Sequence, residues 1–278
     1  MRIFSSLFTI GALAIGAWYT NDRYPDLKNQ ALEFFHTSTF HTLEVRHTGK
    51  QIMENNRYEL LKTAQHKYKD VTLKFYPYLL MEVKYTQPNN TTNEGIILWD
   101  LVDGEMVVNT HDWEKTHGFG DCIHAGLERN EFKIINLLAQ KGGSIDREGL
   151  TSSLHVENEV LDNWLERCRR KKLIVQKGNQ YRLHMQTPRL NVLPHTTVDD
   201  RLVTKQSEKA QRIPRRFSPI QIRKMAERAF GYDFAIRSTL DVYLPIFSIT
   251  VENPDSTLHT SNWNAVNGKR LSHSSFIE

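Results

Sequence analysis

The feature that most constrains the fold of this 278-residue chain is a similarity between its two halves. In each half a hydroxyl residue, Thr48 or Ser218, stands at the N-cap position of a helix-like stretch. Each half then reaches a proline inside an apolar run, and later a Trp-x-x-Val-x-Gly motif. The matching residues are Pro77, Trp99 and Gly104 in the first half and Pro245, Trp263 and Gly268 in the second. Matches in the same order predict two copies of one structural unit.

Each copy has the pattern of a helix followed by strands. β-Branched and aromatic residues dominate after the helix-like stretch, and the Asp-Gly and Asn-Gly dipeptides of the motif favour two-residue hairpin turns. We therefore predict two helix-plus-meander modules, module A over residues 40–112 and module B over residues 218–271. Because proline cannot donate to a strand ladder, Pro77 and Pro245 are each expected on an edge strand or at a bulge.

Tandem modules of this kind resemble the small α+β units of PepSY-like or cystatin-like proteins, which occur in exported bacterial proteins. The resemblance is carried by the helix, the proline-containing strand and the Trp and Gly of each motif. We expect residues 48–110 and 218–271 to superpose, with each tryptophan buried against the helix of its own module. A ligand groove between the two copies is the alternative to this purely structural role.

Between the two modules, residues 129–185 have the pattern of three helices followed by a two-stranded hairpin. Apolar residues recur at helical spacing from Asn130 to Lys141, Asp146 is placed to cap a second short helix, and a third apolar stripe ends at Cys168. The segment from Leu173 to Leu183 predicts a β-hairpin. This order of elements resembles the winged helix-turn-helix superfamily, whose third helix usually enters the major groove of DNA.

Charge on the third helix leaves two functions open for this domain. Its N-terminal part presents Glu157, Glu159 and Asp162, and carboxylates oppose phosphate. Basic side chains gather instead at its C-terminal end, at the wing and in the segment that follows. These candidate nucleic-acid or anion-binding residues are Arg167, Arg169, Arg170, Lys171, Lys172, Lys177, Arg215 and Arg216. Either the domain contacts DNA phosphates through them, or it is a protein-contact or structural domain in which some of them complement the helix dipole.

A connecting loop, residues 113–128, contains residue types that bind zinc. The candidate ligands are His117, Asp121, Cys122 and His124. Their spacing matches no known zinc motif, and a nucleophilic cysteine is a further alternative. We expect instead a glycine-hinged loop that seals the two domains, with Phe119 as an apolar plug and Cys122 or Ile123 packed toward the first helix of the winged helix. No metal or other cofactor is predicted.

The N-terminal residues 1–22 predict a membrane anchor or a signal peptide. The uncharged stretch from Ile3 to Tyr19 would span about 26 Å as a helix, the lower limit for a bilayer core. The aromatic pair at its end favours a retained anchor. Its small residues are equally typical of a signal-peptide cleavage region. Basic residues are balanced on its two sides, so the side of the membrane that holds residues 23–278 stays open.

The net charge of +4 is concentrated in the second half of the chain. Ten Lys and Arg residues lie between Arg189 and Arg228, against four acidic residues. Three prolines and little apolar periodicity in residues 186–217 predict an extended basic linker. The last residues, 272–278, are expected to form a flexible tail.

Together these patterns predict an α+β protein in which a winged-helix domain is inserted between two duplicated helix plus antiparallel-meander modules, behind an N-terminal hydrophobic helix. No enzyme motif stands out. The predicted function is therefore that of a membrane-attached, single-pass, non-enzymatic binding protein, whose winged helix contacts an unknown protein partner or acts as a scaffold. The first alternative is a membrane-tethered, DNA-binding transcription regulator, and the second is a metal-dependent enzyme that uses the loop from His117 to His124.

Overall fold

The computed structural model describes residues 39–87, 90–206 and 210–271. The predicted N-terminal anchor and the predicted tail lie outside these residues. Of the described residues, 41–204 and 210–271 belong to one compact unit. The chain has a mixed α+β fold, with one large mixed sheet and seven helices in the described part.

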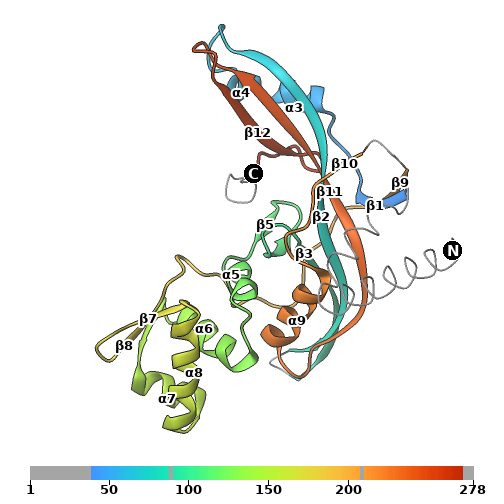
Figure 1. Cartoon of the computed structure of the whole chain (residues 1–278). Coiled ribbons are helices and arrows are strands. Elements are labelled where there is room, and N and C mark those ends of the chain that lie inside the picture. The colour runs from blue at the N-terminus through green and yellow to red at the C-terminus, as the bar shows by residue number, and fades with distance from the viewer. Residues whose placement is uncertain (1–38, 88–89, 207–209, 272–278) are drawn as a thin grey trace, which may run out of the picture. The chain divides into compact units, whose positions relative to one another are not determined.

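Two long antiparallel strands form the centre of the large sheet, β2 (Lys67–Thr86) and β11 (Ala235–Glu252) (Figure 1). The main strand order is β5-β4-β3-β2-β11-β1-β9, while β10 pairs with β2 and β12 pairs with β11. The other strands of this sheet are β1 (Thr39–Leu43), β3 (Thr92–Asp100), β4 (Met106–Asn109), β5 (Glu114–Lys115), β9 (Leu202–Gln206), β10 (Gln211–Arg212) and β12 (Leu258–Asn264).

The two motif prolines lie in these central strands, and neither lies at a bulge. Pro77 pairs with Tyr243 and Pro245 pairs with Phe75, away from the two register shifts of this strand pair. The prediction of an edge strand or a bulge is therefore wrong. On the other side of β2, β10 pairs no further than Phe75 and β3 begins to pair at Tyr78, so Pro77 lies where that neighbour changes. Likewise, β11 pairs with β1 as far as Tyr243 and with β12 from Ile246 onward, so Pro245 also lies where the neighbouring strand changes.

Each half of the chain has a capped helix directly before its long strand. Helix α3 (Gly49–Asn55) begins after Thr48, and helix α9 (Pro219–Phe230) begins after Ser218. In both capping boxes the hydroxyl accepts from the backbone of a glutamine three residues on, and that glutamine side chain accepts from the cap N–H. A short helix, α4 (Arg57–Leu60), follows α3.

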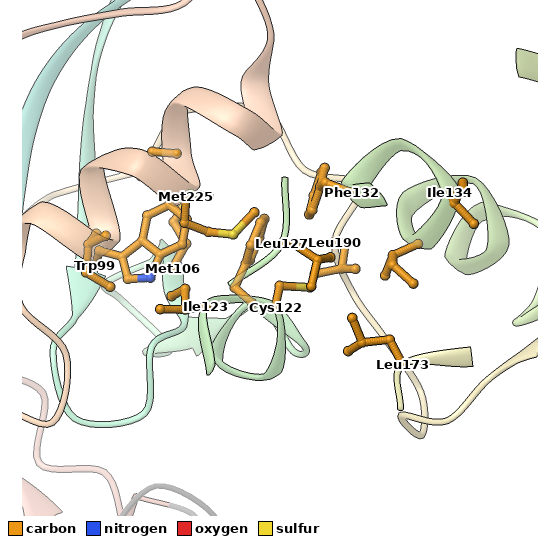
Figure 2. Packing of buried hydrophobic residues seen from close by; sticks show 14 of the residues in the cluster. Trp99, Met106, Cys122, Ile123, Leu127, Phe132, Ile134, Leu173, Leu190 and Met225 are labelled. Carbon is orange, nitrogen blue, oxygen red and sulfur yellow. The ribbon is translucent and has the colours of Figure 1, made fainter. Parts of the chain in front are cut away.

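Both motif tryptophans are buried in strands, but each packs with the helix of the other half. Trp99 on β3 belongs to the same apolar cluster as Met225 of α9 (Figure 2). Trp263 on β12 clusters with Ile52 of α3. The prediction that each tryptophan packs against the helix of its own module is therefore wrong. The long strands are antiparallel, so each half-sheet faces the helix from the other half of the chain.

The segment from residue 129 to residue 185 contains the predicted secondary structure in the predicted order. It comprises α6 (Arg129–Gln140), β6 (Ser144–Asp146), α7 (Arg147–Leu154), α8 (Asn158–Arg170), β7 (Ile174–Lys177) and β8 (Gln180–Leu183), with the strands in the order β6-β8-β7. Asp146 caps α7 as predicted, because its Oδ1 accepts the N–H of Gly149 at 2.7 Å.

The two connecting segments are more ordered than the sequence indicates. The predicted loop 113–128 contains β5 and a short helix, α5 (Phe119–His124). The predicted linker 186–217 contributes β9 and β10 to the large sheet. Their strand pairing depends on partners far away in the sequence, so local composition does not reveal it.

Phe119 is the apolar plug that the sequence predicts. It is fully buried, with its ring centroid 5.0 Å from that of Trp99 and 5.8 Å from that of Phe132 on α6. Cys122 belongs to the same cluster (Figure 2). The cluster is continuous from β3 through α5 to the helices of residues 129–170.

Candidate functional site

Most of the basic residues predicted to contact nucleic acid are paired with carboxylates of the protein. On α8, Glu166 lies 3.3 Å from Arg169 and 3.0 Å from Arg170, measured between nitrogen and oxygen. The buried Glu131 of α6 accepts from Lys171 Nζ at 2.5 Å and lies 3.9 Å from Arg167. The exposed pairs of Glu166 contribute little to stability, but all four pairs lower the net positive charge of this surface.

The remaining candidates differ in their surroundings. Arg215 is paired with Asp241, at 3.0 Å between Nη2 and Oδ2. Lys172, Lys177 and Arg216 make no ion pair within the described ranges. At the N-terminal part of α8, Asp162 forms a bidentate pair with Arg147, which lowers the pKa of this carboxyl group. The eight candidates therefore do not form one continuous surface of unneutralised positive charge.

A polar cleft of about 640 Å³ lies beside the predicted zinc loop. Three of the four candidate ligands, His117, Asp121 and His124, line this cleft, together with Arg216 from the candidate anion-binding set. The fourth, Cys122, is fully buried in the apolar cluster. No group of three or more His, Cys, Asp or Glu side chains is arranged to hold a metal in the described part of the chain.

The loop that carries these residues is held by one buried carboxylate, Glu105. Its Oε1 accepts the backbone N–H groups of Gly118 at 2.8 Å and Gly120 at 3.0 Å, and its Oε2 accepts from the hydroxyl of Thr116 at 2.7 Å. Gly120 also passes so close to Asp103 O that an added Cβ would lie 2.3 Å from that oxygen. The site residues on α5 are therefore fixed by contacts with the turn that precedes β4. No local sequence pattern marks Glu105 as a functional residue, because its partners lie 11 to 15 residues further along the chain.

A buried ionic cluster forms the wall of the same cleft. The Nζ of Lys115 lies 2.6 Å from Asp100 Oδ2 and 2.8 Å from Asp103 Oδ2, and it lies over the ring of Tyr78, 5.5 Å from the centroid. The Tyr78 hydroxyl accepts from Trp113 Nε1 at 3.1 Å. Tyr78, Asp100 and Lys115 come from β2, β3 and β5, so only the folded chain brings the cluster together.

Burial and charge shift the pKa values in this cluster. Burial, and then the neighbouring Asp100, raises the pKa of Asp103 to about 6. Burial lowers the pKa of Lys115, but Asp100, Tyr78 and Asp103 outweigh it, and the pKa is well above the usual value for lysine. Lys115 therefore stays charged, while Asp103 titrates near pH 6.

The two cysteines are buried, free thiols. Burial raises the pKa of Cys122 well above the usual range for a thiol, and nearby carboxylates add to this effect. Burial also raises the pKa of Cys168, to about 12. Because the thiolate is the reactive form, this geometry does not favour Cys122 as a nucleophile.

Beside β3, an extended strap (residues 194–197) fills the gap where β3 and β4 diverge. The N–H of Thr196 donates to Ile96 O at 2.6 Å. Its hydroxyl accepts from the N–H of Leu98 at 2.9 Å and donates to Val107 O at 2.5 Å. Next along the chain, Thr197 N–H donates to Val108 O at 3.0 Å. Thr196 is buried, and this segment was expected to be only a linker.

Comparisons with known proteins provide no relative for this chain. No family model matches it, and neither a curated protein nor a solved structure is significantly similar. None of the helices in residues 39–87, 90–206 and 210–271 is long and apolar enough to cross a membrane. The predicted N-terminal anchor lies before the first of these ranges.

Proposed function

We propose that this chain is a membrane-attached, non-enzymatic binding protein, built from two copies of one module with a winged-helix domain between them. The winged helix makes contacts with a partner protein. One observation carries this proposal: five of the eight basic residues suited to phosphate contacts, Arg167, Arg169, Arg170, Lys171 and Arg215, already have carboxylate partners within the protein.

The duplication is supported by matching hydrogen bonds in the two motif turns. Asp100 Oδ1 accepts the N–H of Val102, and Asn264 Oδ1 accepts the N–H of Val266. Leu101 N–H donates to the carbonyl of Pro77, and Ala265 N–H donates to that of Pro245. The glycines at the ends of these turns both have a positive φ, +80° in the first turn and +72° in the second.

Reciprocal contacts between the halves support it further. The N–H groups of Arg216 and Phe217 both donate to Leu101 O, and those of Arg46 and His47 both donate to Ala265 O. In each half, the residues before the capped helix thus bind the motif turn of the other half. At the centre of the long strand pair, Tyr76 lies opposite Leu244, and both are the residue before the motif proline. Reciprocal contacts of this kind are expected when two copies of a module are related by a local two-fold axis.

A protein-contact role for the winged helix is also favoured by what its wing exposes. Val175 on β7 is 52% exposed, and Val160 on α8 is 39% exposed. Within the described ranges, neither of the acidic residues Glu157 and Glu159 at the start of α8 forms an ion pair. Exposed valines on β7 and α8, together with these carboxylates at the start of α8, fit a protein surface better than DNA.

The test has two parts. Full-length protein is titrated into a labelled mixed-sequence DNA duplex at about 50 mM salt, where phosphate contacts are strong, and we expect no binding. A photo-reactive residue at position 175 should crosslink a discrete protein in the cells that make this chain, whereas the same residue at position 50, an exposed position on α3, should not. Binding to DNA that is lost in an Arg169→Glu, Arg170→Glu, Lys172→Glu variant would contradict the proposal.

The second candidate is a membrane-tethered DNA-binding regulator. It is favoured by Lys172 at the end of α8 and Lys177 at the wing tip, two exposed residues that lack a carboxylate partner among the described residues. Two such contacts per domain predict weak binding with little sequence preference and a shallow dependence on salt. A salt slope that corresponds to two phosphates or fewer is the signature that separates it from a larger interface.

A further inference from the structure

We propose that the outer edge of β12 binds an extended peptide of a partner protein by strand addition, with a Ser or Thr of that peptide placed as Thr196 is placed beside β3. The inference rests on the proposed duplication, in which β12 is the counterpart of β3. It goes beyond the proposed function because it assigns a second surface, outside the winged helix, and the kind of segment that binds there.

The first support is the form of the edge itself. β12 pairs with β11 at seven consecutive positions without a register shift. From Leu258 to Asn264 it has no charged residue and no proline. Exposed sheet edges are usually blocked by lysine, proline, bulges or covering segments, because a regular open edge recruits other strands. β12 itself has none of these sequence features. Residues 269–271 cover the edge at Asn264 and Asn262, and Arg270 Nη2 lies 3.4 Å from His259 Nε2, so the part of the edge suited to strand addition is the remainder of β12.

The second support is the direction of its backbone groups. The N–H of Leu271 donates to Asn262 O at 2.9 Å, on the side of β12 away from β11. In a strand the N–H and C=O of one residue face the same side, and residues two apart share that side. The N–H of Asn262 and the backbone groups of Thr260 therefore also face outward. No hydrogen bond to Asn262 N–H, Thr260 O or Leu271 O is formed within residues 39–87, 90–206 and 210–271.

The third support is that the chain supplies such a segment to the corresponding edge of β3. Trp99 pairs with Met106, and Trp263 pairs with Arg270, so Leu98 corresponds to Asn262 and Val107 to Leu271. The strap meets these β3 and β4 atoms through Thr196, which binds Leu98 N–H and Val107 O with its hydroxyl. The equivalent atoms beside β12 are Asn262 N–H and Leu271 O. An added peptide with a hydroxyl residue would bind them in the same way.

The contacts that the strap makes beside β3 indicate that an extended peptide, rather than the surface of a folded domain, binds the edge of β12. The strap inserts only a few extended residues between two strands, and its main contacts are backbone hydrogen bonds and one hydroxyl. Leu258, at the open end of β12, is 60% exposed and is available to an apolar side chain of the peptide. The partner segment is therefore extended, uncharged at its centre, and contains Ser or Thr next to an apolar residue.

The test uses the full-length protein and a labelled peptide that copies residues 191–199, the strap with its flanking residues. Fluorescence anisotropy should show saturable binding. Replacing the threonine that corresponds to Thr196 with valine should weaken binding about three- to tenfold, because one hydroxyl with two partners is lost. N-methylation of the same residue should weaken it further, since this removes the N–H that would donate to Thr260 O.

A matched pair of protein variants places the peptide at β12. Asn262→Pro removes an outward N–H, which edge strands tolerate, and both Asn262→Pro and Asn262→Ala remove the side chain that accepts from Ser248 Oγ at 2.7 Å, so the two variants differ in the N–H. We expect it to weaken binding at least about tenfold, whereas Asn262→Ala, which keeps the N–H, stays within about twofold. If circular dichroism shows that the Asn262→Pro variant is unfolded, Thr260→Pro and Thr260→Ala make the same comparison at the next residue of β12 whose backbone groups face outward.

Four outcomes would overturn the inference. No saturable binding up to about 1 mM peptide excludes the site, because that corresponds to only about 4 kcal/mol. Equal binding by Asn262→Pro would mean that the peptide replaces the strap beside β3. Binding of a peptide copying residues 272–278, without binding of the strap peptide, would assign the edge to the chain's own terminus. A dimer abolished by Asn262→Pro would assign it to a second copy. The DNA and crosslinking experiments on the winged helix are independent of all four.

Discussion

Asp100 and Asn264 form the same turn with different charge. The Oδ1 of Asp100 accepts the N–H of Val102 at 2.6 Å, and the Oδ1 of Asn264 accepts the N–H of Val266 at 2.8 Å. The second side-chain atom differs: Asp100 Oδ2 accepts from Lys115, whereas Asn264 Nδ2 is buried with no hydrogen-bond partner among the described residues. The two turns therefore have the same shape, and only the first has become part of an ionic cluster.

This relationship predicts the effect of Asp100→Asn. Asparagine fits the turn, as Asn264 shows, so the Oδ1 hydrogen bond should survive. Lys115 then loses one of its two carboxylates while it stays buried. We expect a loss of about 3 kcal/mol in the free energy of unfolding, the usual size for breaking a buried ion pair. Urea denaturation measures it. The exposed pair of Lys50 and Glu54 is the control, since Glu54→Gln should cost less than about 0.5 kcal/mol.

Asp103 should impose a pH dependence on stability. Its pKa is raised to about 6 in the folded protein, above its usual value of 3.8. Between these values the folded state binds more protons than the unfolded state, so the Asp103 contribution to stability falls as the pH rises from about 4 to about 6 and is constant above that. In Asp103→Asn this part of the pH profile should disappear.

Urea denaturation of both proteins at intervals between pH 4 and pH 7 checks this prediction. The substitution suits the turn, because Asn267 holds the corresponding place and its Oδ1 accepts from Lys269 N–H as Asp103 Oδ1 accepts from Glu105 N–H. A difference between the two proteins that does not change over this pH range would show that Asp103 titrates outside it.

Sequence patterns predicted the elements of residues 129–185 because their signals are local. The cap at Asp146, the apolar period of α6 and the glycine with φ of +62° in the β7–β8 turn all act within a few residues. The same holds for the capping boxes after Thr48 and Ser218. That this domain is a winged helix stays a proposal, because order of elements alone does not establish a family.

The parts that sequence did not predict depend on distant partners. Lys115 meets Asp100 only when β5 lies against β4. The contacts of Glu105 with residues 116–120 likewise form only when these segments are folded together. The strap is polar and proline-containing, which is typical of a linker, but Thr196 is buried because β3 and β4 diverge around it. Neither feature leaves a periodic pattern in the chain.

Thr196 is predicted to be a major contributor to stability despite its place in a connecting segment. Thr196→Val keeps the side-chain volume but leaves Leu98 N–H and Val107 O buried without this hydroxyl. We expect a loss of about 3 kcal/mol in the free energy of unfolding, measured by urea denaturation. Thr197→Val is the matched control, because that side chain is exposed, and it should change stability by less than about 0.5 kcal/mol. If the two substitutions change the free energy of unfolding equally, the buried hydroxyl of Thr196 does not make the predicted contribution to stability.

Elemental analysis tests the predicted zinc ligands. His117, Asp121 and His124 share the cleft, but Cys122 lies in the apolar cluster and is not directed toward them as a fourth ligand. We expect the purified protein to contain much less than one zinc per chain. Stoichiometric zinc that is lost in Cys122→Ser would instead show that the loop rearranges to bind metal.

The two thiols should be unreactive in the folded protein. Cys122 and Cys168 are fully buried, and burial raises both pKa values, so very little thiolate is present and reagents have no access. A disulfide-exchange reagent should modify both of the chain's cysteines quickly in guanidinium chloride, and in buffer only at the rate at which the protein opens. Cys168→Ser isolates the Cys122 signal. A fast reaction of Cys122 in buffer would show that α5 opens without global unfolding, and a nucleophilic role for this loop would then have to be reconsidered.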